Sequence, residues 1–212
     1  MMPETPGKEF GADLATGKMV VGVDEAGRGP LAGPVVAAAV LLGQDYPAGI
    51  DDSKKLTANV RARLYDEIRA SCVCGIAVVD VQEIDRLNIF GATMLAMSLA
   101  VGELCTTLGR DDVSALIDGN LTPQGRCERW RWPARAIVGG DGKEASIGAA
   151  SILAKHYRDK MMEEAARNHP QYGWERNKGY GTKDHIAALR KYGPSPLHRR
   201  SFAPVAQMEM IV

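Results

Sequence analysis

The chain has 212 residues, of which 45% are hydrophobic, and its 26 lysines and arginines balance its 26 aspartates and glutamates. The length predicts one domain, or one domain with a small appendage, and the apolar fraction is sufficient for a buried core. A net charge of zero excludes a global field that attracts nucleic acid, and we expect no run long enough to span a membrane.

The cysteines show neither zinc-ligand spacing nor a clear disulfide framework. Reduced thiols are the default for such a set, which suits the cytosol and predicts a cytoplasmic protein. Residues 1–18 are mostly polar and small and lack the apolar segment of a signal peptide, so we expect a polar N-terminal leader.

Two short apolar runs, residues 19–23 and 35–42, are predicted to be buried strands because Gly and Pro bound them. Asp24 and Glu25 come directly after the first run. Carboxylates that emerge from a buried strand are costly to desolvate unless something pairs with them. A divalent cation such as Mg²⁺ or Mn²⁺ is a suitable partner. The alternative is a pair of solvated acids in a turn.

The segment Gly27-Arg28-Gly29-Pro30-Leu31-Ala32 has the letters of a dinucleotide-binding fingerprint. That fingerprint requires a helix after it, to receive a pyrophosphate, whereas residues 35–42 read as a strand. We therefore reject a dinucleotide site. The glycines either let backbone N–H groups approach a ligand closely or form a tight turn between two strands.

The rest of the chain alternates strands and helices before it becomes helical. This order predicts an α/β fold, with a mixed sheet, helices packed on it and a small helical C-terminal appendage. The predicted elements are a helix after the N-cap Thr57, a strand over 72–79, helices over 80–87 and 90–108, strands over 113–118 and 135–138, and helices over 144–168 and 183–192.

Three predicted strand ends or near-ends carry acids, namely Asp24-Glu25, Asp118 and Asp141. If the strands lie side by side, these ends can converge on one edge, where four carboxylates would repel one another strongly. Two divalent cations about 4 Å apart would offset that repulsion, in an arrangement typical of phosphoryl transfer. Each acid alone could instead belong to an ordinary turn.

The long helix over 144–168 carries Ser151, Lys155 and Arg158 on one face. These side chains form either a solvated stripe or, beside a metal site, a set of phosphate contacts. Basic residues also outnumber acids over 178–200, which indicates a solvated surface or a local contact with nucleic acid.

The segment Gly22-Val23-Asp24-Glu25-Ala26-Gly27-Arg28-Gly29-Pro30-Leu31-Ala32-Gly33 closely resembles the N-terminal signature of bacterial ribonuclease HII, the type 2 ribonucleases H. Further blocks resemble the family in order along the chain. They include Asp52-Ser53-Lys54-Lys55-Leu56, Leu87-Asn88-Ile89, Ile117-Asp118-Gly119-Asn120, Gly140-Asp141, Ala149-Ala150-Ser151-Ile152-Leu153-Ala154-Lys155, Lys178-Gly179-Tyr180-Gly181-Thr182 and His198-Arg199-Arg200-Ser201-Phe202.

The resemblance implies a ribonuclease H-like catalytic domain over 19–168 and a helical substrate-binding region over 169–212. It implies a monomeric endonuclease that cuts the RNA strand of RNA–DNA hybrids and single ribonucleotides embedded in duplex DNA, a step in ribonucleotide excision repair. The products would carry 3′-hydroxyl and 5′-phosphate ends. The family's catalytic and metal-binding acids map onto Asp24, Glu25, Asp118 and Asp141, which would bind Mn²⁺ or Mg²⁺.

The resemblance also implies how the substrate is recognised. The segment Gly27-Arg28-Gly29 would read the 2′-hydroxyl group through its backbone, and this group distinguishes RNA from DNA. Tyr180 matches the tyrosine that packs on the sugar of the following deoxynucleotide. The substrate backbone would be held by Lys54, Lys55, Asn88, Ser151, Lys155 and Arg158.

The chain departs from the family pattern at Gly148, where Ser or Ala is usual, and at His156-Tyr157, where Val-Thr is usual. Both departures lie on the helix assigned to phosphates and leave its detailed role open. Two other functions compete with the ribonuclease. A DNA nuclease or strand transferase of related fold would not need a 2′-hydroxyl reader, and a non-catalytic hybrid-binding protein would be expected to have a broken acid quartet.

Overall fold

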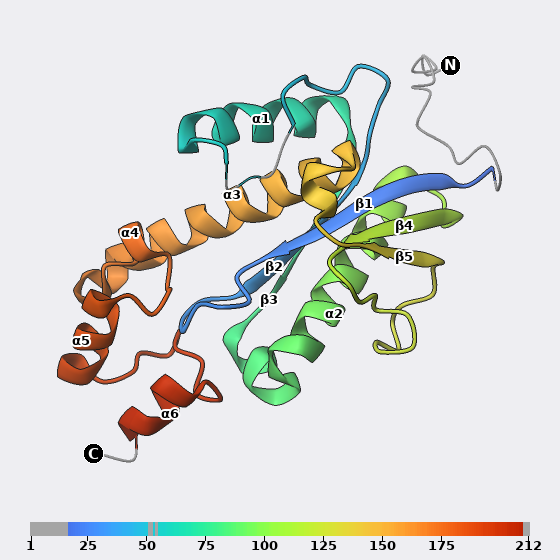
Figure 1. The fold of residues 1–212 in the computed structure, drawn as a ribbon. Coiled ribbons are helices and arrows are strands. Elements are labelled where there is room, and N and C mark those ends of the chain that lie inside the picture. The colour runs from blue at the N-terminus through green and yellow to red at the C-terminus, as the bar shows by residue number, and fades with distance from the viewer. Residues whose placement is uncertain (1–16, 51–52, 54, 210–212) are drawn as a thin grey trace, which may run out of the picture.

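A five-stranded sheet, in the order β3-β2-β1-β4-β5, forms the centre of the computed structural model, which describes residues 17–50, 53 and 55–209 (Figure 1). β1 pairs antiparallel with β2, and β2 with β3, whereas β1, β4 and β5 run parallel. The sheet is therefore mixed, as predicted. Its strands are β1 (Met19–Ala26), β2 (Val35–Leu41), β3 (Val73–Val79), β4 (Val113–Asp118) and β5 (Ala134–Ile137).

Helices cover both faces of the sheet, with α1 and α3 on one face and α2 on the other (Figure 1). β2 is buried on both faces, which explains its continuous apolar sequence. The helices are α1 (Ala58–Ser71), α2 (Val81–Leu108), α3 (Ala145–Asn168), α4 (Trp174–Asn177), α5 (Lys183–Tyr192) and α6 (Ala203–Glu209), with 3₁₀ turns η1 (Gly140–Gly142) and η2 (Pro170–Tyr172).

The N-terminal part of α3 lies directly against β1. A Cβ atom at Gly22 would stand 2.1 Å from the backbone carbon of Ser146, so no larger residue fits at this crossing. The buried alanines Ala149, Ala150 and Ala154 continue the close contact along the helix. This packing brings the polar face of α3 next to the end of β1, where Asp24 lies.

Helix α2 is interrupted at Asn88, which has φ 58° and ψ 169°. The Asn88 side chain accepts hydrogen bonds from the backbone N–H groups of Phe90 and Gly91, as an N-cap does. This confirms the prediction of two helices on either side of this residue. By length and composition α2 could cross a membrane, contrary to the sequence expectation, but here it packs on the sheet.

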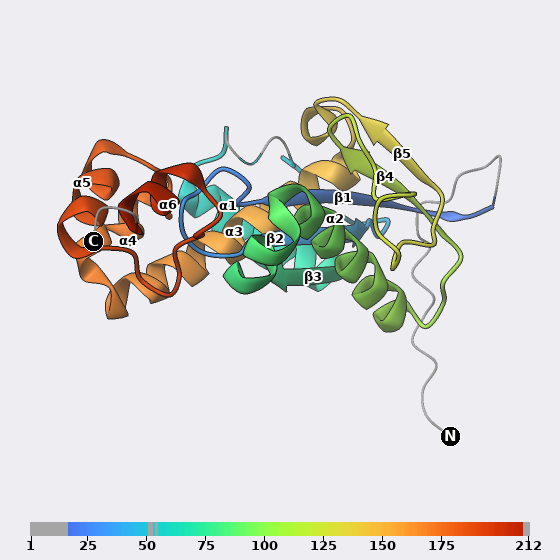
Figure 2. The same ribbon diagram turned by 90° about the horizontal axis from the view of Figure 1, so that it is seen from below.

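The C-terminal helices α4, α5 and α6 lie together at one end of the molecule, beyond the sheet (Figure 2). Backbone hydrogen bonds join this region to the segment after β1. The N–H of Leu31 donates to the Gly179 carbonyl, and the 197–199 segment bonds to both Gly33 and Leu31. The short helices α4 and α6 were not predicted. Val205 of α6 is buried against Leu31 and Leu189, a long-range contact that local sequence does not reveal. The domain division at 168/169 stays a prediction.

Candidate active site

Three aspartates converge at the carboxyl edge of the parallel strands. Asp24 lies near the end of β1 and Asp118 ends β4, its parallel neighbour, with Val23 paired to Ile117. Asp141 lies in η1, which follows β5. One carboxylate oxygen of each of these aspartates lies within 4.8 Å of the others. The predicted gathering of these three acids is therefore present in the structure.

Glu25 is not a member of this close group of described residues, although it lines the same cavity. Successive side chains of a strand alternate between its two faces. The Asp24 side chain therefore leaves β1 on the face that α3 covers. The Glu25 side chain leaves β1 on the opposite face, which α2 covers, as the Val23 side chain does. The Glu25 carboxylate accepts a hydrogen bond of 3.2 Å from Arg28, which partly neutralises it.

The charges at this edge are poorly compensated. Burial raises the pKa of Asp24 well above its usual value, and the charges of Glu25 and Asp118 raise it further, while a hydrogen bond from Ser151 lowers it. Burial also raises the pKa of Glu25, against the lowering effect of Arg28. Carboxylates that are desolvated and close together need a cation to remain ionised, so these residues fit a divalent metal ion.

Asp118 also fixes the position of Asp141. Its Oδ1 atom accepts hydrogen bonds from the backbone N–H groups of Gly140, at 2.8 Å, and Asp141, at 3.4 Å. The turn η1 is thereby held against the end of β4. The Asp118 carboxylate thus orients the turn that carries Asp141.

A cavity of about 260 Å³ lies beside the carboxylates. It brings together nine of the predicted site residues and adds Ala26 and Ser53. Its lining residues are Asp24, Glu25, Ala26, Gly27, Arg28, Gly29, Ser53, Ser151, Lys155, Arg158 and Tyr180. A larger hollow of about 560 Å³ between α2 and the 126–129 segment contains none of the four acids. We therefore place the site at the smaller cavity.

Two described residues among the predicted substrate contacts, Asn88 and Lys55, lie outside the cavity lining. Asn88 is exposed in α2, on the other face of the sheet. Lys55 is exposed, and its Nζ atom lies 3.9 Å from the position that a Cβ at Gly142 would take, next to Asp141. Lys54 lies outside the described residues.

The segment Gly27-Arg28-Gly29 rests on two buried arginines. Gly27 has φ 99°, and a Cβ there would lie 2.0 Å from Nε of Arg158, so only glycine fits. Arg199 donates hydrogen bonds to the carbonyl oxygens of Gly27 and Arg28, at 2.6 and 3.0 Å, and to those of Gly33 and Pro34. The sequence analysis did not predict this role of Arg199, although Arg199 lies in one of the segments that resemble the family, His198-Arg199-Arg200-Ser201-Phe202.

Arg158, from α3, packs against Gly27 and holds the stretch that follows the glycine segment. Its side-chain nitrogens donate to the carbonyl oxygens of Pro34, Lys178 and Ala32, at 2.9 to 3.1 Å, and the residue is only 1% exposed. Arg158 thereby joins the stretch from Ala32 to Pro34 to the loop that carries Tyr180. The predicted contact between Arg158 and a phosphate stays a prediction.

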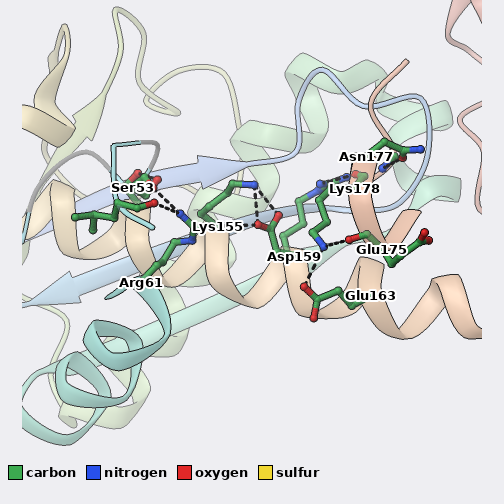
Figure 3. Close-up of polar contacts among 12 residues, drawn as sticks. Ser53, Arg61, Lys155, Asp159, Glu163, Glu175, Asn177 and Lys178 are labelled. Carbon is green, nitrogen blue, oxygen red and sulfur yellow. Dashed lines mark hydrogen bonds and ion pairs between the residues drawn. The ribbon is translucent and has the colours of Figure 1, made fainter. Parts of the chain in front are cut away.

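A polar network connects α1, α3 and Ser53 along one wall of the cavity (Figure 3). Lys155 donates to both carboxylate oxygens of Asp159, at 2.6 and 2.8 Å, and Arg61 reaches the same carboxylate at 3.7 Å. Arg61 also donates to the backbone carbonyl of Ser53, whose hydroxyl lies 2.9 Å from that of Ser151. Ser151 and Lys155 therefore sit at the cavity in a fixed arrangement.

Tyr180 closes the cavity on the side of the C-terminal region. The residue is 45% exposed, and its Cε1 atom lies 3.5 Å from the position of a Cβ at Gly29. The aromatic ring therefore stands beside the glycine segment with one part open to solvent. The structure thus brings the two predicted reading elements side by side.

Comparisons with known proteins agree with this geometry. A family model described as Ribonuclease HII matches residues 21–205. The protein named Ribonuclease HII of Erythrobacter litoralis (strain HTCC2594) is 62% identical over 210 residues, which cover 99% of each chain.

Solved structures share the fold. The ribonuclease H2 of Pyrococcus horikoshii OT3 has a TM-score of 0.73 and 24% identity, and covers 91% of this chain and 97% of its own. Bst-RNase HIII, solved in complex with Mn²⁺, has a TM-score of 0.71 and 20% identity, and covers 93% of this chain and 72% of its own. The chain therefore belongs to the ribonuclease HII family and is an enzyme of the ribonuclease H type, which acts on RNA-containing nucleic acids and depends on divalent metal ions.

Proposed function

We propose that the protein is an endonuclease for the RNA strand of RNA–DNA hybrids and for single ribonucleotides embedded in duplex DNA. Cleavage on the 5′ side of the ribonucleotide leaves a 3′-hydroxyl and a 5′-phosphate. One observation carries the proposal. Three aspartates lie within 4.8 Å of one another, and the cavity beside them is bounded by both the glycine segment 27–29 and Tyr180.

The metal site consists of Asp24, Asp118 and Asp141, with Glu25 as a fourth acid from the opposite face of β1. The support is the raised pKa of Asp24 and Glu25, which follows first from burial and then from neighbouring charges, so a bound cation would favour the ionised carboxylates. These acids would hold two ions of Mg²⁺ or Mn²⁺, which would supply an activated water and charge stabilisation at the leaving 3′ oxygen. The likeness to Bst-RNase HIII, which binds Mn²⁺, agrees with this assignment.

Gly27-Arg28-Gly29 and Tyr180 select the ribonucleotide. Gly29 has no side-chain atoms, so the backbone beside Tyr180 can approach the 2′-hydroxyl group closely, whereas Arg158 fills the position that a side chain at Gly27 would take. The ring of Tyr180 stands next to Gly29 and packs on the sugar of the following nucleotide. A deoxyribose fits against the ring without a buried hydroxyl group, which favours a junction from RNA to DNA.

The sugar–phosphate backbone is held around the cavity. Ser151 and Lys155 present a hydroxyl and an ammonium group at its wall, and Lys55 is exposed beside η1. Arg158 contributes mainly through the loop that it supports, because all its guanidinium nitrogens already donate to carbonyl groups. Lys54 and Asn88 complete the proposed backbone contacts. Such contacts position the duplex without reading its sequence.

The decisive experiment uses an end-labelled DNA duplex with one ribonucleotide, an RNA–DNA hybrid and an all-DNA duplex, each with Mg²⁺ and with Mn²⁺. We expect one cut on the 5′ side of the ribonucleotide and none in all-DNA. Cleavage of all-DNA at a similar rate would overturn the proposal in favour of a DNA nuclease. Tyr180→Ala is expected to reduce cutting at the single ribonucleotide, while Tyr192→Ala, at an exposed tyrosine of α5, serves as the control.

We also propose that the enzyme works as a monomer in the cytoplasm. All four cysteines lie in the described part of the chain and are free, which suits a reducing compartment. Light scattering of the purified protein tests the oligomeric state, and a dimer mass would contradict it.

A further inference from the structure

Two buried histidines lie in the C-terminal region, next to the loop of Tyr180. His185 belongs to α5 and is 0% exposed, and His198, in the segment that runs beside Ala32, is 1% exposed. Their Nε2 atoms are 3.1 Å apart. The proposed mechanism uses neither ring, and neither ring has a carboxylate among its hydrogen-bond partners in the described chain.

Groups that can only donate determine which nitrogen of each ring carries the proton. The backbone N–H of Ser195 donates to Nδ1 of His198 at 2.9 Å, so the His198 proton must lie on Nε2. The indole N–H of Trp174 donates to Nε2 of His185 at 3.1 Å, so that nitrogen must be unprotonated. The contact between the rings therefore runs from His198 Nε2–H to His185 Nε2.

The same logic reaches Tyr180. The remaining nitrogen of neutral His185, Nδ1, carries its proton and lies 2.9 Å from the carbonyl oxygen of Tyr180, to which it donates. That oxygen also accepts the backbone N–H of Thr182 at 2.8 Å, and the Tyr180 N–H donates to the Asn177 carbonyl at 2.8 Å. The backbone of Tyr180 is thus fixed on both sides, while its ring stands at the cavity.

We infer that His185 and His198, both neutral, form a chain of hydrogen bonds, here called the relay, that positions Tyr180 for the substrate. The Ser195 N–H donates to His198, His198 donates to His185, and His185 donates to the Tyr180 carbonyl. His185 and His198 are positioning residues in this scheme and do not touch the substrate. The inference rests on the proposed contact between Tyr180 and the sugar, and it names the residues that set the specificity of that contact.

Burial keeps both rings neutral. It lowers the pKa of His185 below its usual value, and it lowers the pKa of His198 to about 4, with a further contribution from His185. A second proton on His198 would face the Ser195 N–H, and one on His185 would face the Trp174 N–H. Each charged form would therefore oppose two donors, and among their hydrogen-bond partners in the described chain only His198 has another acceptor near the added proton, the Ser195 hydroxyl oxygen at 3.0 Å from Nδ1.

The first test is direct. Nitrogen-15 NMR spectra of the histidine rings in the full-length wild-type protein at neutral pH distinguish the two tautomers. We expect the Nδ1–H tautomer for His185 and the Nε2–H tautomer for His198. The opposite tautomer at either ring, or a charged ring, would overturn the relay. This readout does not depend on activity or on any variant.

The second test uses a matched pair of variants at His185. The amide nitrogen of His185→Asn stands near Nδ1 and can still donate to the Tyr180 carbonyl, whereas the oxygen of His185→Gln stands near Nε2 and can only accept there. His185→Asn leaves the N–H groups of Trp174 and His198 without their acceptor, whereas His185→Gln removes one donor from the Tyr180 carbonyl, so we expect the lower melting temperature in His185→Asn. The readout is the ratio of kcat/KM for the single-ribonucleotide duplex to kcat/KM for the RNA–DNA hybrid.

We expect this ratio to fall about fivefold in His185→Gln, the effect of about one lost hydrogen bond, and to stay near the wild-type value in His185→Asn. Equal ratios in the two variants, or a larger fall in His185→Asn, would overturn the relay, since a purely structural role would affect the less stable His185→Asn at least as much. Tyr180→Ala distinguishes a failure of the relay from a failure of the proposed contact between Tyr180 and the sugar. If it lowers the ratio while His185→Gln does not, only the relay fails; if it leaves the ratio unchanged, the proposed contact of Tyr180 fails, and the inference fails with it.

Discussion

Two regions of the molecule carry buried charge with opposite degrees of compensation. One is the edge of the sheet with its aspartates, and the other is the pair of arginines beneath the glycine segment. At the edge, Asp24 is 5% exposed and lies close to Asp118 and Asp141, so like charges are crowded in a desolvated site. Under the glycine segment, Arg158 and Arg199 are almost completely buried, yet carbonyl oxygens accept hydrogen bonds from their guanidinium groups.

This difference distinguishes a region that binds a ligand from a region that holds the fold. A buried charge without a partner is unfavourable and is stabilised by a ligand of opposite charge. A buried charge whose donors are all satisfied holds its surroundings in one arrangement. The first region is therefore expected to respond to metal and to gain stability when its charge is removed, and the second is expected to lose stability when any donor is removed.

The largest expected effect comes from removing metal. Chelation with EDTA should stop turnover completely, and added Mg²⁺ or Mn²⁺ should restore it, because the carboxylates alone cannot stabilise the leaving oxygen. Cleavage of the single-ribonucleotide duplex is the measurement, and a zinc-specific chelator is the control. Undiminished activity in EDTA would exclude the two-ion scheme.

The substitution Asp24→Asn should have two opposite effects. Activity should fall by more than about 100-fold, since even residues that only support metal ligands account for about 10–100-fold. The metal-free protein should melt at a higher temperature, because the variant removes a buried charge next to Glu25 and Asp118; each 1 kcal/mol gained raises Tm by about 2–4 °C at this size.

Asp45→Asn, at an exposed aspartate, is the matched control and should change neither quantity. A lower melting temperature in Asp24→Asn would contradict the view that this edge is destabilised by its own charge.

Arg199→Lys tests the second region. Lysine keeps the positive charge but cannot reproduce the fork of donors that binds four carbonyl oxygens, so the free energy of unfolding should decrease by about 3 kcal/mol. Urea unfolding measures the loss. Arg200→Lys, at the exposed neighbour, should change the free energy by less than about 0.5 kcal/mol. Similar values for the two variants would mean that the buried fork does not hold the glycine segment.

The smallest expected effect is the pH dependence from His198. Its pKa is about 4 in the folded protein and 6.5 in the unfolded chain, so the unfolded chain binds the proton first as the pH falls. The contribution of neutral His198 to the free energy of unfolding is therefore fully present above pH 6.5. It is lost between pH 6.5 and about 4, by roughly 3 kcal/mol at most.

Urea unfolding at several pH values in this window measures the effect. His198→Gln should have a flatter profile than the wild type, whereas His169→Gln should change the slope much less, because His169 is the smallest of the named contributors to the lowered pKa of His198. The comparison isolates His198, because the raised pKa values of Asp24 and Glu25 act in the opposite direction and are common to all three proteins. Parallel profiles for His198→Gln and the wild type would contradict the assignment.

Local patterns were enough to predict most of the sheet and its helices. Apolar runs bounded by Gly and Pro indicated β1 and β2, and the break at Asn88 indicated two helices where the structure has an interrupted one. The acids at strand ends were recognisable because parallel neighbours bring their carboxyl ends to one edge. The short helices α4 and α6 escaped prediction because their stability comes from contacts with distant residues.

The sequence by itself determined the type of sheet, the three aspartates at its edge and the membership of the ribonuclease HII family, since strand periodicity and short motifs are local properties. Only the tertiary structure decided that Glu25 lies outside the close group of three aspartates, that Arg199 supports the glycine segment and that two histidines connect to the Tyr180 carbonyl. These contacts join residues far apart in the chain, and their energies depend on burial, which exists only after the chain has folded.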